Sequence, residues 1–300
     1  MTISSEISNL ETTLGSALGR RYRLKPLQVK CTYPVFRGEA DGVAPVFVKV
    51  GTREEWTRTA NLLKEIGCGL FSRFLTDALI EFDGSAVFVM EWRESKTVFP
   101  EDMTERQIES FVAGCVKLSA VLQRARGVLG ITSPANLAPD ELFENILQYV
   151  RRHPFAGRLL KRLTEIPEAE RTYGTRPWAV CHGDFHAKNF GFAGDELAAV
   201  FDFDKLTEGL CCSDLVNALC ERFSCFHLSR VARLRLKDVS RRIVARVPWP
   251  REELVIACNV IRLQFAARRI RKHPDSAWVA LDVLRRDRAI RGFLSCLEAS

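Results

Sequence analysis

Several common sequence signals are missing from this 300-residue chain, and each absence narrows the class of protein. No hydrophobic run approaches the roughly eighteen residues that a membrane-spanning helix requires. Residues 1–6 lack the basic and then apolar pattern of a secretory leader, so we expect a cytoplasmic location. Internal repeats and low-complexity stretches are also missing. A hydrophobic content of 47% is enough for a sizeable core, and together these features predict a soluble globular protein.

The ten cysteines show no Cys-x-x-Cys pair, the spacing typical of structural zinc sites. Most of them lie in apolar surroundings, which favours free, buried thiols in a reducing cytosol. The cluster of Cys211, Cys212, Cys220 and Cys225, with His227 nearby, falls where a helix is expected. We therefore expect this cluster to pack in the core rather than to bind zinc.

Charge is distributed unevenly along the chain. Residues 1–92 carry 11 Lys and Arg against 11 Asp and Glu, whereas residues 222–300 carry 18 against 7, a balance of +11. A basic region can attract an anionic substrate, nucleic acid or an acidic protein. Its arginines alternate with apolar residues at helical spacing, so we favour amphipathic helices that place arginine on their outer faces. An acidic partner stays open, whereas nucleic acid, a membrane and a polycationic substrate are not favoured.

The most informative stretch is HGDFHAKN at residues 182–189, followed by VFDFD at residues 200–204. Phosphoryl transfer from a nucleoside triphosphate needs one carboxylate to deprotonate a hydroxyl. It also needs an amide and a second carboxylate to hold the Mg²⁺ that bridges the phosphates. Asp184 is the candidate base, Asn189 the amide ligand and Asp202 the metal carboxylate. Apolar residues predict a strand at 178–180 that leads into the loop, and a second strand at 197–203 that delivers Asp202.

The pattern from His182 through Asn189 resembles the HGDxxxxN signature of the aminoglycoside phosphotransferase and choline-kinase-like superfamily. This resemblance implies an α+β, bilobal protein-kinase-like fold with ATP and Mg²⁺ as cofactors. It implies the same roles for Asp184, Asn189 and Asp202, and it implies that Asp214, on a later helix, braces the catalytic loop. The function expected is transfer of the γ-phosphoryl group of ATP to a hydroxyl of a small molecule.

The order of the predicted elements agrees with that fold. Strands dominate residues 1–92, a small N-lobe that would bind the nucleotide, and the pairs Asp41-Gly42 and Asp83-Gly84 predict hairpin turns within it. A first strand is expected at 27–31. Helices dominate residues 93–300, a larger C-lobe that would hold the catalytic loop and the acceptor site.

This order of elements places a lysine and its partner at the nucleotide. Lys49, in the apolar strand 46–50, would contact the α- and β-phosphates as a compact cation. Glu55, in the next helix, is the expected partner of Lys49, with Glu54 and Glu65 as alternatives.

The adenine ring is expected at the strand that enters the hinge between the lobes. Met90 and Trp92 would shape an apolar slot, and backbone groups of Glu91 to Arg93 would bond the edge of the base. An ordinary buried strand explains the same apolar pattern.

Two further loop residues are candidates for catalysis. His186 could donate to the γ-phosphate or to the catalytic carboxylate, or it could only brace the loop. Lys188 could offset negative charge in the transition state, or it could point outward.

One departure from the kinase pattern keeps other functions open. Residues 30–34 occupy the turn where a Gly-x-Gly-x-x-Gly loop would approach the phosphates, and they contain no glycine. The alternatives are a nucleotide-binding pseudokinase that acts as a scaffold and a kinase that acts on protein hydroxyls.

Overall fold

The structure is a computed structural model that describes residues 3–27, 34–66, 69, 72–76, 78–125, 139–171, 179–225, 227–276 and 278–298. The chain forms two compact units. The N-terminal unit comprises Met1–Ser95 and Ala198–Asp204, and the C-terminal unit comprises Lys96–Leu197 and Lys205–Ser300.

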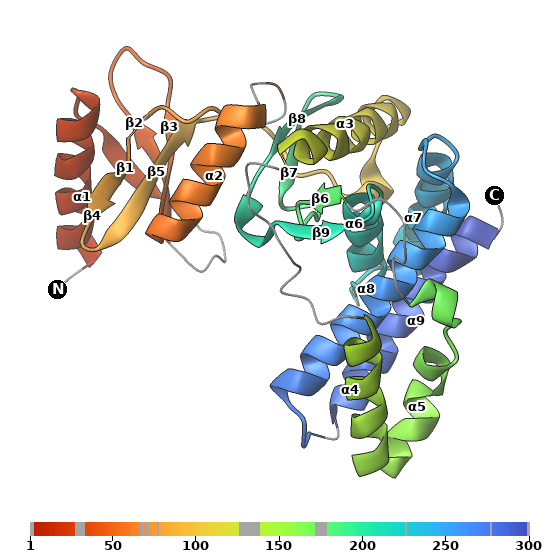
Figure 1. Ribbon diagram of the computed structural model, residues 1–300. Coiled ribbons are helices and arrows are strands. Elements are labelled where there is room, and N and C mark those ends of the chain that lie inside the picture. The colour runs from red at the N-terminus through yellow and green to blue at the C-terminus, as the bar shows by residue number, and fades with distance from the viewer. Residues whose placement is uncertain are drawn as a thin grey trace. The chain divides into compact units, whose positions relative to one another are not determined.

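An antiparallel sheet of five strands forms the centre of the N-terminal unit (Figure 1). The strands lie in the order β1-β2-β3-β5-β4, with bounds Arg23–Pro26 (β1), Val35–Glu39 (β2), Val46–Gly51 (β3), Ile80–Phe82 (β4) and Ser85–Glu91 (β5). Strand β1 ends at Pro26, before the first strand predicted at 27–31. Within that predicted range, Leu27 lies outside any strand, and residues 28–31 fall outside the described part. The hairpin at Asp83-Gly84 is confirmed, with φ of 49° and 74°, because both central residues of a type I′ turn need positive φ.

The two faces of this sheet carry different side chains, because successive residues of a strand point to opposite sides. One face packs against Leu10 and Leu14 of helix α1 (Ile3–Leu18) and forms the core of the unit. Its buried members include Leu24, Phe36, Val46, Val48, Val87 and Val89. Helix α2 (Arg53–Ile66) covers the other side of the sheet (Figure 1). Lys49 and Phe88 are direct cross-strand partners on that side.

Helices dominate the C-terminal unit. They are α3 (Glu105–Arg124), α4 (Pro139–Arg152), α5 (Pro154–Thr164), α6 (Ser213–Phe223), α7 (Arg230–Val244), α8 (Arg251–Lys272) and α9 (Trp278–Glu298). Helices α8 and α9 run side by side, and α4 packs on α8 (Figure 1). An apolar cluster joins these helices, with Ile146, Tyr149, Leu263, Ala266, Val279 and Val283 among its buried members.

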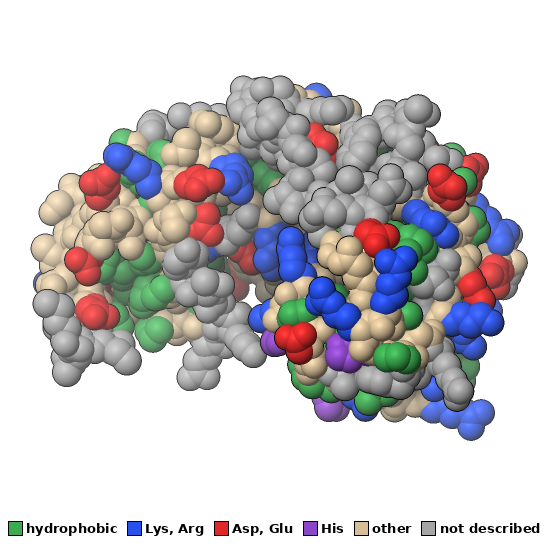
Figure 2. Space-filling view, turned by 60° about the horizontal axis from the view of Figure 1, so that its bottom comes forward, with side chains coloured by type: hydrophobic (Ala, Val, Ile, Leu, Met, Phe, Trp, Pro, Cys, Tyr) green, Lys and Arg blue, Asp and Glu red, His purple; other side chains and the backbone are tan. Residues whose placement is uncertain are grey.

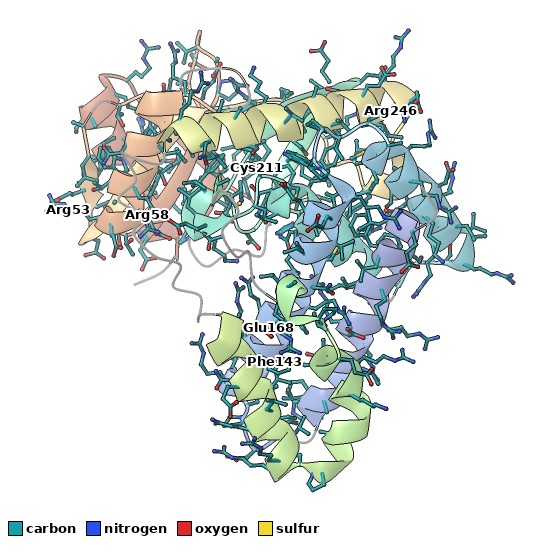
Figure 3. All side chains as sticks on the ribbon, turned by 45° about the vertical axis from the view of Figure 1, so that its right-hand side comes forward. Arg53, Arg58, Phe143, Glu168, Cys211 and Arg246 are labelled. Carbon is teal, nitrogen blue, oxygen red and sulfur yellow. The ribbon has the colours of Figure 1, made fainter. Side chains whose placement is uncertain are left out.

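Helix α3 is fixed at its start to a small hairpin. Thr104 and Gln107 form a reciprocal capping box, which satisfies two backbone donors at the first turn. The Gln107 side chain also donates to the carbonyl of Gly194, in the turn between β7 (Phe190–Ala193) and β8 (Glu196–Val200). Just beyond the end of α7, Arg246 (labelled in Figure 3) forms an ion pair with Glu105 in the first turn of α3. The bond from Gln107 holds α3 against the hairpin that follows the predicted catalytic loop, and the pair with Arg246 ties the same end of α3 to α7.

The surface of the C-terminal unit shows how the charged side chains of the predicted basic region are distributed. On the right-hand part of the face shown in Figure 2, Lys and Arg side chains alternate with acidic and apolar ones. Among the described helices, none combines the length and the apolar character that a bilayer crossing would need.

Candidate active site

The loop formed by residues 182–189 connects two short strands of the C-terminal unit. Strand β6 (Ala179–Cys181) pairs antiparallel with β9 (Thr207–Gly209), and β7 begins directly after the loop. Below the loop, the ring of Phe185 is fully buried, with its centroid 6.1 Å from that of Phe111 and 5.1 Å from that of Phe190. Burial of these aromatic rings anchors the loop, because each ring removes a large apolar area from water.

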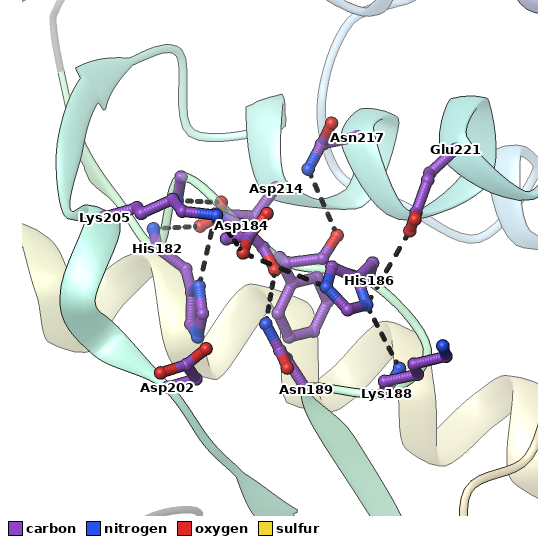
Figure 4. A network of polar contacts seen from close by, with 12 residues as sticks. His182, Asp184, His186, Lys188, Asn189, Asp202, Lys205, Asp214, Asn217 and Glu221 are labelled. Atoms are coloured by element: carbon purple, nitrogen blue, oxygen red, sulfur yellow. Dashed lines mark hydrogen bonds and ion pairs between the residues drawn. The ribbon is translucent and has the colours of Figure 1, made fainter. Parts of the chain in front are cut away.

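Asp214 holds the start of the loop from below, as predicted. Its carboxylate accepts hydrogen bonds from the backbone N–H groups of His182 at 2.7 Å and Gly183 at 3.1 Å (Figure 4). Burial raises the pKa of Asp214 above its usual range, while His182 and the two N–H donors act in the opposite direction. The side chain is therefore a structural acceptor enclosed in the unit, and it positions the residues that precede Asp184.

Asp184 and Asn189 are brought together by the five-residue spacing. The amide Nδ2 of Asn189 donates to the carbonyl oxygen of Asp184 at 2.9 Å, and the backbone N–H of Asn189 donates to the carbonyl oxygen of His186 at 2.8 Å. Because Nδ2 is held by the chain, Oδ1 is the atom of this buried amide that can coordinate a cation. The Asp184 carboxylate is half-buried on the same loop.

His186 lies between two carboxylates. Its Nε2 is 3.9 Å from Oδ2 of Asp184, and its Nδ1 is 3.7 Å from Oε2 of Glu221 on α6 (Figure 4). Nδ1 also accepts from the backbone N–H of Lys188 at 3.3 Å, while the Lys188 side chain is exposed. On the same helix, the Asn217 amide donates to the carbonyl of Phe185 at 3.3 Å. The geometry thus joins His186 to the base, and it leaves Lys188 on the outside of the loop.

Lys205 was missed by the sequence analysis. Its Nζ lies 2.6 Å from Oδ2 of Asp184, closer to the base than any residue predicted to assist it (Figure 4). Twenty-one positions separate the two residues, and no linear motif connects them. The pairing of β6 with β9 could have suggested the contact only if that register had been known.

Asp202 meets Lys49 within the N-terminal unit. Nζ of Lys49 lies 3.2 Å from Oδ1 of Asp202, and the lysine is buried, with its ammonium 5.7 Å from the centroid of the Phe88 ring. The strand predicted to deliver Asp202 ends earlier, at Val200, and Asp202 has a φ of +64°. A non-glycine residue in this conformation is uncommon and is found where the surrounding structure imposes it, often at functional sites.

Glu55 has a different partner from the one predicted. Its carboxylate accepts from the backbone N–H of Thr52 at 2.9 Å, and the Thr52 hydroxyl accepts from the N–H of Glu55 at 3.1 Å. This reciprocal pair is a capping box for α2, and the Thr-x-x-Glu pattern at residues 52–55 could have indicated it. Of the alternatives, Glu54 pairs with Arg58 at 2.8 Å, and the side chain of Glu65 lies outside the described part.

The residues predicted for the adenine slot end strand β5. The N–H of Glu91 donates to the carbonyl of Arg73 at 2.8 Å, so this donor is already engaged in the unit. The Trp92 ring lies 4.8 Å from the guanidinium of Arg37, and its Nε1 donates to Glu94 at 2.8 Å. Met90 is half-buried on the sheet. The phosphate turn predicted at residues 30–34 lies outside the described part except for Pro34.

The cysteine cluster packs mainly in the helical core. Cys212 and Cys220 are fully buried, as predicted, whereas Cys211 and Cys225 are half-buried. Across the described residues, no group of three or more His, Cys, Asp or Glu side chains has an arrangement that could hold a metal ion.

Comparison with known proteins gives one family and many similar folds. A family model described as "Phosphotransferase enzyme family" matches residues 61–243. A search of curated proteins gives no match. Among solved structures, a thermostable mutant of aminoglycoside phosphotransferase APH(4)-Ia, in a ternary complex with ADP and hygromycin B, has a TM-score of 0.61. It is 13% identical in sequence, over 95% of this chain and 98% of the other.

Two further structures support the same comparison. Amicoumacin kinase hAmiN, in complex with AMP-PNP, Ca²⁺ and Ami, has a TM-score of 0.57 at 11% identity, over 96% of this chain and 95% of the other. Macrolide 2'-phosphotransferase MphH from Brachybacterium faecium has a TM-score of 0.54 at 13% identity, over 95% of this chain and 97% of the other. At these identities the likeness shows the fold, and it confirms the predicted α+β, protein-kinase-like class.

Proposed function

We propose, from the premise that this chain belongs to the phosphotransferase enzyme family, that it moves the γ-phosphoryl group of ATP to a hydroxyl of a small molecule. The observation that carries the proposal is the arrangement of the loop at residues 182–189. Asp214 fixes its start, Asn189 is bonded to the carbonyl of Asp184, and the Asp184 carboxylate is left partly exposed at the loop. A base carried on a loop whose backbone is fixed is what in-line transfer to a hydroxyl requires.

The proposed chemistry uses Asp184 as the base. The acceptor oxygen attacks the γ-phosphorus while its proton passes to the Asp184 carboxylate. The bond between that phosphorus and the bridging oxygen breaks, and ADP keeps the electron pair. His186, 3.9 Å from the same carboxylate, would steady its orientation. Lys188 is exposed, and its proposed role is to offset negative charge in the transition state.

The donor set suits a hard divalent cation. Asn189 offers an amide oxygen and Asp202 a carboxylate, and Mg²⁺ prefers oxygen ligands. When bound, Mg²⁺ would neutralise the negative charge of the phosphates. Asn189 and Asp202 are the proposed ligands, and Lys49 would supply a further positive charge toward the α- and β-phosphates.

In this proposal the two predicted lobes bind different substrates. Residues 1–92 would bind ATP, with Met90 and Trp92 beside the adenine, and residues 93–300 would hold the base and the acceptor. The solved structures that share the fold include complexes with hygromycin B and with spectinomycin, both small molecules, alongside ADP. This supports a small-molecule acceptor for the present chain without naming it.

A pair of variants tests the role of the base. Asp184→Asn should lower turnover by about 10²–10⁴, the usual contribution of a general base, and should leave the affinity for Mg·ATP within about threefold. Asp238→Asn, at an exposed carboxylate of α7, is the matched control and should retain full turnover. Turnover is measured as ADP formed with a panel of hydroxylated amines, sugars and denatured protein, and affinity by calorimetry.

Measurements of nucleotide affinity and of turnover distinguish the proposed roles of Asp202 and Lys188 and the alternative functions. Asp202→Ala should abolish nucleotide binding that depends on Mg²⁺, and an unchanged affinity would remove Asp202 from the metal site. Lys188→Met should lower turnover if its charge assists transfer. Tight ATP binding with no consumption on any acceptor would support the scaffold alternative. Consumption with denatured protein alone would support a protein kinase.

A further inference from the structure

The carboxylate of Asp184, the proposed base, is paired with the ammonium group of a lysine that no motif predicts. Nζ of Lys205 is 2.6 Å from Oδ2 of Asp184, and Nε2 of His186 is 3.9 Å from the same oxygen (Figure 4). In the described part of the chain, these contacts of the carboxylate both use Oδ2. The other oxygen, Oδ1, is therefore the one that can face an incoming hydroxyl.

The backbone sets the position of Lys205, although its side chain is 64% exposed. Lys205 ends a short 3₁₀ turn (Phe203–Lys205), and two residues later Thr207 pairs with Cys181 at the end of β6. The backbone of Gly183 lies directly against the carbonyl oxygen of Lys205 itself. The residue before the base is thus packed on the residue that supplies the ammonium, so the two side chains start from a fixed separation.

We propose that Lys205 is a positioning residue for phosphoryl transfer: it holds Oδ2 of Asp184 so that Oδ1 receives the proton of the acceptor hydroxyl. The proposal rests on the function proposed above. During the reaction the acceptor O–H bond breaks, its proton moves to Oδ1, and the new O–P bond forms as the bond to the leaving ADP oxygen breaks. Lys205 keeps its own protons throughout and acts only through Asp184.

An exposed lysine paired with a carboxylate usually contributes little to stability. The consequence proposed here is for catalysis, where a small misplacement of a reacting group can cost about 10²-fold in rate. A base that is free to rotate would present either oxygen, or neither, to the acceptor. The ion pair removes that freedom before substrate arrives.

The first test compares three variants of the full chain. Lys205→Met removes the charge and keeps the length, Lys205→Arg restores the charge, and Lys161→Met removes an exposed, ion-paired lysine on α5 as a matched control. Lys205→Met should lower turnover by about 10–10²-fold with an affinity for Mg·ATP within about threefold. Lys205→Arg should recover at least about tenfold of that loss, and Lys161→Met should match the unmodified protein.

A double-mutant cycle separates positioning from a merely structural role. In the Asp184→Asn background, Lys205→Met should cause less than about a twofold further loss, because the group on which it acts has already been changed. Single-turnover rates with radiolabelled ATP give the sensitivity that this comparison needs. An equal loss in both backgrounds would show that Lys205 acts elsewhere, and the proposal would be wrong.

The outcomes distinguish this proposal from the function on which it rests. If the unmodified protein binds no Mg·ATP and consumes none with any acceptor, the proposed function fails and the role of Lys205 fails with it. If the unmodified protein turns over and Lys205→Met stays within about twofold of its rate, only the role of Lys205 is overturned.

Discussion

The backbone of Gly183 packs so closely on the carbonyl oxygen of Lys205 that an added Cβ would lie under 3.0 Å from it. Gly183 also has a φ of +77°, a conformation that residues with a side chain rarely adopt. Both constraints act one residue before Asp184. The glycine of the HGD pattern is thus required by the contact between the loop and the segment that follows Asp202, as well as by the turn itself.

Gly183→Ala is therefore expected to destabilise the fold by about 2–4 kcal/mol. Left-handed backbone accounts for about 1–2 kcal/mol of this, and the displaced carbonyl for the rest. Urea denaturation measures the change in the free energy of unfolding. Gly194→Ala is the control, because Gly194 has a φ of +62° and open space around its Cβ position, so only the cost of about 1–2 kcal/mol applies. Equal costs at the two positions would contradict the close packing on Lys205.

Local patterns in the sequence were sufficient where one segment determines the geometry. The spacing of Asp184 and Asn189 predicted that one loop presents both, and Asp83-Gly84 predicted a hairpin turn, because each depends on a few successive residues. The bracing role of Asp214 followed from a family resemblance and is confirmed by its two hydrogen bonds. These features need no knowledge of distant contacts.

Other features depend on contacts that the linear sequence does not contain. The ion pair of Lys205 with Asp184 requires the register between β6 and β9, which no hydrophobic pattern specifies for strands of three residues. Glu55 was assigned to Lys49 by position in the helix, although a local capping box engages its carboxylate. The Thr-x-x-Glu pattern that begins at Thr52 indicates this capping box, but the assignment of Glu55 followed the expected kinase-like fold instead.

The thiols offer a test of burial that is independent of catalysis. Cys211 (labelled in Figure 3) is half-buried, whereas Cys212, the next residue, is buried. This burial raises the pKa of the Cys212 thiol. Because the thiolate is the reactive form, a short pulse of iodoacetamide on the folded protein should label Cys211 at least about tenfold faster than Cys212. Peptide mass spectrometry resolves the two positions, and unfolding in urea should remove the difference. Preferential labelling of Cys212 would contradict the packing of this segment.

A buried ion pair joins the long helices of the C-terminal unit. Nε of Arg262 on α8 donates to Oδ1 of Asp287 on α9 at 2.7 Å, and the side chains are only 6% and 4% exposed. Asp287→Ala should cost about 3–5 kcal/mol in unfolding free energy, because the guanidinium stays buried after its carboxylate is removed. Asp282→Ala is the control on the same helix, since its partner Arg269 is 34% exposed, and it should cost about 1 kcal/mol. Similar costs would show that burial does not distinguish the two pairs.

Asp214 should give the stability of the protein a dependence on pH with a defined sign. Burial raises its pKa in the folded protein, so the folded state binds this proton more tightly than the unfolded state does. Between the usual pKa of an aspartate and the raised one, the contribution of Asp214 to stability therefore falls as pH rises. The contribution is largest below that window, where Asp214 is protonated in both states.

Asp214→Asn removes this titration and keeps the shape of the side chain. The variant should lose about 1–3 kcal/mol, because its amide can accept only one of the two N–H groups that the carboxylate accepts. Unfolding free energies of both proteins at about pH 5 and about pH 8 should show the gap between them narrowing as pH rises, since other titrating groups are common to both. A gap that widens with pH would mean that the hydrogen bonds from His182 and Gly183 outweigh burial. Asp214 would then hold the catalytic loop as a stabilised carboxylate.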